Sequence, residues 1–145
     1  MSHIIRTPTS DDAADLAVLV TELGYPSTIE ELTERLAKVD GIPGVFVRVA
    51  EVDGSVAGLA TCHRFLSLHK TEPVVWLTSL VVSSEHRGEG IGHALVAACE
   101  TWAKEQGAER LSLTSATHRE AAHAFYLGMG YEQTGVRLAR IFSSR

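Results

Sequence analysis

A glycine-rich loop between an apolar run and a helical pattern is the feature that most constrains the fold of this chain. Residues 74–82 read VVWLTSLVV, a nearly continuous apolar run that is typical of a strand buried on both faces. After the loop, apolar residues recur three and four positions apart, which indicates one face of a helix: Ile91, Leu95, Ala98 and Trp102. The loop itself has glycine at alternate positions, Gly88, Gly90 and Gly92. The pattern predicts a buried strand that turns directly into a helix.

This loop has the chemistry of a phosphate-binding site. Glycine lacks a Cβ atom and adopts positive φ easily, so several backbone N–H groups can point at one place. The following helix adds its own unpaired N–H groups and the positive end of its dipole. Arg87, at the mouth of the loop, would add a fixed positive charge. We expect a phosphate or pyrophosphate to bind here, and a plain strand-to-helix turn without a ligand is the alternative.

Two common phosphate-binding motifs do not fit the spacing. A Walker loop requires Gly-Lys-Ser/Thr after its glycines, whereas this loop has Gly-Ile-Gly-His. The dinucleotide pattern G-x-G-x-x-G would place its third glycine at His93. Both motifs are excluded, and the pattern that remains is Arg87-x-x-Gly90-x-Gly92.

Length and composition bound the class of protein. A chain of 145 residues can bury about 70% of its unfolded surface, so we expect a single domain over residues 1–145 that needs no disulfide or metal. Cys62 and Cys99 lie inside apolar runs, as reduced thiols of cytoplasmic proteins do. Neither a leader nor a membrane-spanning run is apparent, and the net charge of −5 argues against nucleic acid as a partner. We therefore expect a cytoplasmic protein with no membrane or nucleic-acid partner.

The remaining patterns predict a mixture of strands and helices. Asp53-Gly54 lies between two alternating runs and predicts a hairpin, so the middle three strands would form an antiparallel meander. A crossover helix then implies a parallel strand after the loop helix. The expected strands are 4–7, 44–52, 55–66, 74–82 and 110–115, the expected helices are 10–23, 27–38, 91–105 and 117–127, and residues 131–142 would be extended as one bent strand or two.

A second motif near the end of the chain makes the interpretation of the loop more specific. Residues 119–131 read REAAHAFYLGMGY, which predicts a short helix with an aromatic pair, terminated by Gly-Met-Gly. Together the two motifs resemble those of the GNAT superfamily of N-acetyltransferases. The loop resembles the family's acyl-CoA pyrophosphate loop, Gln/Arg-x-x-Gly-x-Gly/Ala. The second stretch resembles its C-terminal signature, with matches at Arg119, Ala122, Phe125, Tyr126, Gly130 and Tyr131.

The resemblance covers residues 45–142 and implies a fold and a reaction. The fold would be α/β (α+β): a mixed, mostly antiparallel central sheet of six to seven strands, about four flanking helices, and a strand pair that splays apart at the acetyl-CoA site. The reaction would transfer the acetyl group of acetyl-CoA to a primary amine of a small molecule or peptide. The amine would attack directly in a ternary complex, without a metal. Family members are often homodimers, and the resemblance leaves open whether this chain forms one.

The same resemblance implies the site residues. Backbone groups of Leu80, Val81 and Val82 would pair with the pantetheine arm, and an amide at or near Leu80 would polarise the thioester. Arg119 would contact the pantetheine or a phosphate, or be solvated. Tyr126 would donate a hydrogen bond to the leaving thiolate, with simple packing against CoA as the alternative. The pyrophosphate would lie on the N–H groups of Arg87, Gly88, Glu89, Gly90, Ile91, Gly92 and His93.

One departure from the family leaves the proton acceptor open. Many relatives carry a carboxylate on the strand before the loop, where this chain has Thr78 and Ser79, and a hydroxyl is not a base at neutral pH. The proton would pass through water to a carboxylate elsewhere, such as Glu22, or to solvent. The histidines do not have the spacing of a zinc site. Two other functions remain to be tested: a non-catalytic acyl-CoA-binding sensor or regulatory module, and a nucleotide-binding protein.

Overall fold

The computed structural model describes residues 2–115 and 120–143, which divide into two compact units, residues 1–112 and 113–145. The single domain expected over residues 1–145 stays a prediction. In the first unit the helices are η1 (Ser10–Asp12), α1 (Ala13–Leu23), α2 (Ile29–Val39), η2 (Ser84–His86) and α3 (Ile91–Glu105), and the strands are β1 (Ile4–Arg6), β2 (Val45–Val52), β3 (Ser55–Phe65) and β4 (Val74–Val82). β5 (Leu111–Leu113) lies at the boundary, and the second unit contains α4 (Glu120–Gly128).

The five strands form one sheet in the order β1-β2-β3-β4-β5. The three pairs β1–β2, β2–β3 and β3–β4 are antiparallel, with Phe46 opposite Cys62 and Leu59 opposite Val81. The Asp53-Gly54 turn joins β2 to β3, and both of its residues have positive φ, as a tight hairpin requires. The predicted antiparallel meander is confirmed, while the parallel direction of β5 stays a prediction.

The number of strands is a correction to the sequence-based expectation. The described residues form five strands, whereas six to seven were expected, because residues 131–142 form no strand. Apolar side chains along this tail are 84–94% exposed: Val136, Leu138, Ile141 and Phe142. An extended apolar pattern becomes a strand only when a neighbouring edge supplies backbone hydrogen bonds, and that condition cannot be read from the pattern alone.

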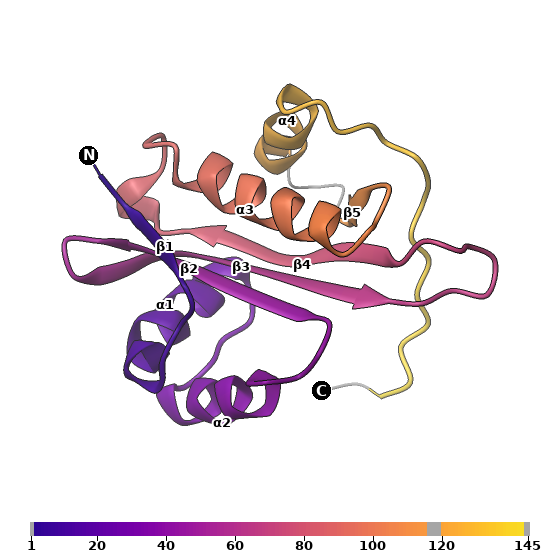
Figure 1. Ribbon diagram of the computed structural model, residues 1–145. Coiled ribbons are helices and arrows are strands. Elements are labelled where there is room, and N and C mark those ends of the chain that lie inside the picture. The colour runs from indigo at the N-terminus through magenta and orange to yellow at the C-terminus, as the bar shows by residue number, and fades with distance from the viewer. Residues whose placement is uncertain (1, 116–119, 144–145) are drawn as a thin grey trace. The chain divides into compact units, whose positions relative to one another are not determined.

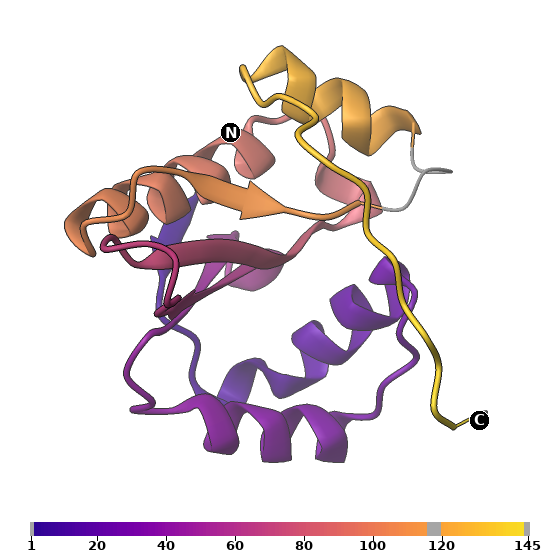
Figure 2. The same ribbon diagram turned by 90° about the vertical axis from the view of Figure 1, so that its right-hand side faces the viewer.

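In the first unit, helices cover both faces of the sheet (Figures 1 and 2): α1 and α2 lie on one face and α3 on the other. Leu16 and Leu19 of α1 pack in one cluster with Val49 of β2 and Leu59 of β3. Because both faces are covered, β3 is buried along most of its length, with alternate side chains directed into the two layers. None of the described helices combines the length and the hydropathy that a membrane span needs.

Gly58 of β3 sets the position of α3. A Cβ atom at this glycine would lie 2.9 Å from Cδ1 of Leu95 and 3.0 Å from Cγ2 of Ile91, so the helix packs on the strand at a distance that only glycine allows. Farther along the helix, Trp102 stacks on Phe46 of β2 with ring centroids 5.0 Å apart. The helix predicted from the periodicity after the loop is confirmed, with Ile91 and Leu95 fully buried.

The two cysteines face each other between β3 and α3. Both are free and buried, as the sequence predicted. A hydrogen bond with Cys99, together with burial, raises the pKa of the Cys62 thiol, so it stays protonated at neutral pH.

A buried carboxylate ties the start of α1 to the edge of the sheet. Asp12 accepts two hydrogen bonds from the Arg6 guanidinium, at 2.8 and 2.9 Å, and one from the backbone N–H of Thr9 at 2.7 Å. Arg6 also donates to Glu51 of β2 at 2.9 Å. The hydrogen bonds from Arg6, more than any other cause, hold the pKa of Asp12 below its usual value.

We predict that Asp12→Asn destabilises the fold in a pH-dependent way. The folded state favours the carboxylate, so its contribution is complete above pH ~4 and is lost as pH falls through the lowered pKa. At pH 7 the variant should lose about 1–3 kcal/mol in urea unfolding, and this difference should shrink towards pH 3. The exposed neighbour provides the control, since Asp11→Asn should change little. A difference that stays constant from pH 7 to pH 3 would contradict the assignment.

We also predict that Gly58→Ala costs about 1–3 kcal/mol in the free energy of unfolding, because the added Cβ would crowd Leu95 and Ile91. Leu95→Val removes the nearer of the two contacting atoms. The cost of Gly58→Ala should therefore be smaller in a Leu95→Val background, with a coupling of at least about 0.5 kcal/mol in a double-mutant cycle. Strictly additive costs would show that α3 does not depend on this close contact.

Candidate functional site

Two glycines turn the chain between β4 and α3. Gly88 and Gly90 have φ of +83° and +84°, in the left-handed region that side chains disfavour. A Cβ atom at either position would meet no atom within 4 Å. Glycine is therefore required here by the backbone conformation and not by the space around it. The third glycine, Gly92, lies in the first turn of α3. The loop therefore leaves open space beside its backbone.

The N-terminus of α3 has the features of an anion site. Its N-cap is Gly90, which has no side chain to accept hydrogen bonds from the first turn, and the first turn contains no acidic residue. The first intrahelical bond runs from the N–H of Ala94 to the carbonyl of Gly90 at 3.1 Å. The N–H groups of Ile91 and Gly92 precede this bond in the first turn and lie at the positive end of the helix dipole.

Side chains and backbone hold the loop at the end of β4. The N–H of Ser83 donates to the carbonyl of Ala57 in β3 at 2.7 Å, and Nε of Arg87 donates to the carbonyl of Val82 at 3.4 Å. His86 and Glu89 pair across the loop at 3.2 Å. These contacts fix where the loop starts and how it closes, while the two glycines set its turn.

A β-bulge interrupts β4 two residues before the predicted pantetheine segment. Thr61 lies opposite Ser79 and Cys62 lies opposite Leu77, so Thr78 is an extra residue in β4. The Thr78 hydroxyl donates to the carbonyl of Thr61 at 3.2 Å and lies 2.7 Å from the Thr61 hydroxyl. Bulges re-aim side chains, often beside active sites. The structure thus places Thr78 and Ser79 at a local distortion of the strand.

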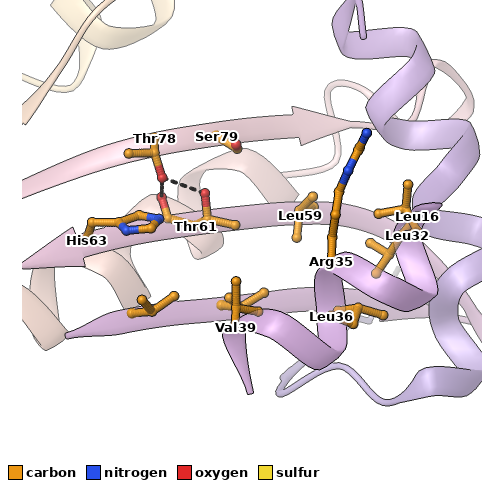
Figure 3. Close-up of a pocket in the computed structure, with 12 residues that line it drawn as sticks. Leu16, Leu32, Arg35, Leu36, Val39, Leu59, Thr61, His63, Thr78 and Ser79 are labelled. Carbon is orange, nitrogen blue, oxygen red and sulfur yellow. Dashed lines mark hydrogen bonds between the residues drawn. The ribbon is translucent and has the colours of Figure 1, made fainter. Parts of the chain in front are cut away.

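This distortion borders a cavity of about 280 Å³ on the face of the sheet that α1 and α2 cover. Figure 3 shows the hydroxyls of Thr61 and Thr78 beside the ring of His63, while the leucines lie farther along the cavity. The residues that line it are Leu16, Leu32, Arg35, Leu36, Val39, Val45, Val47, Leu59, Thr61, His63, Thr78 and Ser79.

Sequence reasoning missed His63 and Arg35 as site residues. A signal existed for the histidine, because Thr61 and His63 are two residues apart in a strand and share one face of the sheet. No such signal exists for Arg35, because its helix reaches the cavity only through the tertiary packing. Glu22, the carboxylate considered as a proton acceptor, accepts a hydrogen bond from Ser84 at 3.4 Å and is not among the residues lining the cavity.

The backbone of Leu80, Val81 and Val82 runs between two strands. On one side these residues lie opposite Ala60, Leu59 and Gly58 of β3. On the other side the neighbour is β5, which has three residues where β4 has nine. Among the described residues, β5 is therefore long enough to pair with about a third of that edge of β4.

The second unit contains Tyr126. Its ring lies edge-on to Phe125 at 5.3 Å and to Tyr131 at 5.7 Å, and the N–H of Tyr131 donates to its carbonyl at 3.0 Å. Gly130, with φ of +94°, turns the chain after α4 as the sequence predicted. Arg119 lies outside the described residues. Residues 2–115 and 120–143 contain no cluster of three or more potential metal ligands.

Comparisons with known proteins agree on one family. The model of the acetyltransferase (GNAT) family matches residues 14–131. An aminoglycoside N(6')-acetyltransferase type 1 of Stenotrophomonas maltophilia is 34% identical over 136 residues, covering 90% of this chain and 86% of that protein. The aminoalkylphosphonate N-acetyltransferase of Salmonella typhimurium is 31% identical over 142 residues, covering 94% and 89%.

A solved structure agrees on the fold. An aminoglycoside N-acetyltransferase in complex with CoA superposes with a TM-score of 0.84 at 18% identity, over 98% of this chain and 96% of that one. The strands and helices of this chain therefore follow a known fold. The chain is a member of the GNAT family of acetyltransferases and is an acetyl-CoA-dependent acyltransferase.

Proposed function

We propose that the protein transfers the acetyl group of acetyl-CoA to a primary amine of a small molecule by direct attack in a ternary complex. The observation that carries this proposal is the dual role of β4. Its end leads into an uncapped helix N-terminus through two left-handed glycines, and its bulge borders a cavity with hydroxyls and an imidazole. One strand thus links an anion site to a place where an amine can bind.

In this proposal the backbone holds the CoA. The pyrophosphate lies on N–H groups between Arg87 and His93, at the N-terminus of α3. The pantetheine arm pairs with Leu80, Val81 and Val82 along the edge of β4 that β5 covers only in part. The CoA bound in the solved relative of the same fold supports this arrangement. Arg119 belongs to the proposal as a contact to the pantetheine or a phosphate.

The chemistry needs three groups besides the substrates. A backbone amide at or near Leu80 stabilises the oxyanion that forms when the amine attacks the thioester carbonyl. The amine's proton must go to an acceptor, and we assign this role to His63, which brings an imidazole nitrogen to the described lining of the cavity. The departing thiolate takes a hydrogen bond from the phenol of Tyr126. Thr78 and Ser79 hold the amine or a relaying water, as hydroxyls can.

The names of the two curated relatives support a small-molecule acceptor. One acts on aminoglycosides and the other on aminoalkylphosphonates, and both kinds of substrate present an amino group on a small molecule. The two substrates have opposite charge, so the relatives leave the acceptor of this chain undetermined within that class.

The first test of the proposal is ligand binding. CoA at a hundred times its dissociation constant should add ~2.7 kcal/mol to the stability of the fold and raise the melting temperature, whereas ATP and NAD should not. Gly90→Ala should weaken CoA binding about tenfold or more in calorimetry, because the strained backbone shifts the N–H groups.

Gly54→Ala is the matched control for the loop variant. Gly54 has the same left-handed backbone, with φ of +81° and no atom within 4 Å of an added Cβ, but it lies in the β2–β3 hairpin. Both variants should lose about 1–2 kcal/mol of stability. Gly54→Ala should keep the parent's affinity for CoA, whereas Gly90→Ala should lose it. Equal loss of affinity in both variants, or stabilisation by ATP in place of CoA, would refute the proposed CoA site.

A second test addresses catalysis through Tyr126. We predict that Tyr126→Phe lowers kcat for release of CoA thiol by about 100-fold, with the dissociation constant of CoA nearly unchanged, because only the hydroxyl is removed. Tyr131→Phe, at the adjoining ring, is the control and should keep kcat within a few-fold. Tight CoA binding with no thiol release from any amine, and no effect of Tyr126→Phe, would instead identify a non-catalytic acyl-CoA-binding module.

A further inference from the structure

The cavity beside the β4 bulge is divided into a polar end and an apolar end. Figure 3 shows Thr61, His63 and Thr78 together on β3 and β4, and Leu16, Leu32 and Leu36 at the other end. Seven of the twelve lining residues are aliphatic: Leu16, Leu32, Leu36, Val39, Val45, Val47 and Leu59. A ligand that fills this cavity must therefore match one polar end and one long apolar wall.

Arg35 contributes its stem to the wall and directs its charge elsewhere. The guanidinium donates to the hydroxyl of Ser27 at 2.9 Å and lies 3.8 Å from the carboxylate of Glu31. Its side chain is 50% exposed, and in Figure 3 its nitrogen atoms point away from the hydroxyls of β3 and β4. The guanidinium is thus directed towards Ser27 and Glu31 at the start of α2, and the methylene groups of Arg35 face the cavity.

The lining contains no group that could balance several positive charges. Of the described residues that border the cavity, none is Asp or Glu. One ammonium group of an acceptor must lose its proton before it can attack the thioester. A polycationic acceptor would keep its other ammonium groups charged against aliphatic side chains, which is costly without a paired carboxylate. A phosphonate or carboxylate on the acceptor would meet the same apolar wall.

The volume bears on the size of the acceptor. About 280 Å³ lies just below the usual range of ligand pockets, ~300–1,000 Å³. A small amine therefore suits this cavity better than an aminoglycoside of two or more rings.

We infer that the acceptor is a compact monoamine with an uncharged, apolar body. Its amino group lies at the hydroxyls of Thr61 and Thr78 and the ring of His63, and its body lies along the leucine and valine wall. This inference rests on the proposed acetyl transfer and narrows it to one substrate class. It departs from the charged substrates that the names of both curated relatives indicate.

A series of straight-chain amines tests the inference. With n-propylamine to n-octylamine as acceptors, kcat/KM for CoA thiol release should rise about fourfold for each added methylene, the equivalent of ~0.8 kcal/mol, until the cavity is full. Kanamycin and 2-aminoethylphosphonate, run in parallel, should react at least 100-fold less efficiently than the best alkylamine. The same amines should raise the melting temperature of the CoA complex in the same order.

Variants of the wall should shift the preferred chain length in opposite directions. Leu32→Phe narrows the apolar end and should move the optimum to a shorter amine, whereas Leu36→Ala enlarges it and should move the optimum to a longer one. The control is Val18→Phe on the exposed face of α1, where the side chain is 59% exposed and does not line the cavity. This variant should leave the dependence of kcat/KM on chain length unchanged. Melting curves of each variant without amine check that it is folded.

The outcomes separate this inference from the proposed function. Acetylation of kanamycin or 2-aminoethylphosphonate in preference to every alkylamine, or an optimum that neither wall variant moves, would overturn the inference and leave acetyl transfer intact. Failure of every amine to release CoA thiol, in a protein that CoA stabilises, would overturn the proposed function and the inference with it.

Discussion

The close packing of α3 on β3 at Gly58 is the constraint on which the rest of the first unit depends. Because no side chain separates them there, Ile91 and Leu95 reach the strand backbone, and the helix starts beside the end of β4. The eight residues 83–90 must then complete the connection. Such a short path needs left-handed backbone at Gly88 and Gly90, and the same turn leaves the helix without a side-chain cap. The anion site is therefore a consequence of how the helix packs.

The proposed acceptor cavity arises from a second constraint, on the neighbouring strand β4. The bulge at Thr78 gives β4 an extra residue relative to β3, while α1 and α2 must still cover this face. Aliphatic side chains from both helices and from β2 meet the sheet around the distortion without filling it. The sheet thus has a tight helix contact at Gly58 of β3 and a loosely covered bulge at the middle of β4. Close packing at one place and incomplete packing at another give the two sites of our proposal.

The parts of this structure that local backbone chemistry dictates could be predicted from the sequence. Glycines at alternate positions predicted the turn before α3, and Asp53-Gly54 predicted the hairpin. The cavity could not be predicted, because its lining comes from α1, α2, β2, β3 and β4 and depends on how these elements pack. The tail could not be predicted either. Its apolar pattern suits a strand, but strand formation depends on a partner edge, and Val136 and Leu138 are almost fully exposed.

This contrast between the two sites follows from what each must recognise. A pyrophosphate is the same in every acyl-CoA, and backbone N–H groups suffice to bind it, so the requirement appears in the sequence as glycine. An acceptor differs from one enzyme to another and is recognised by side chains on separate elements, in our proposal Val45, Leu36 and His63. On this proposal, substitutions in α2 or β2 change the acceptor without moving the strand and helix assigned to CoA. Family membership consequently specifies the cosubstrate, while the proposal assigns the choice of amine to the shape and charge of the cavity.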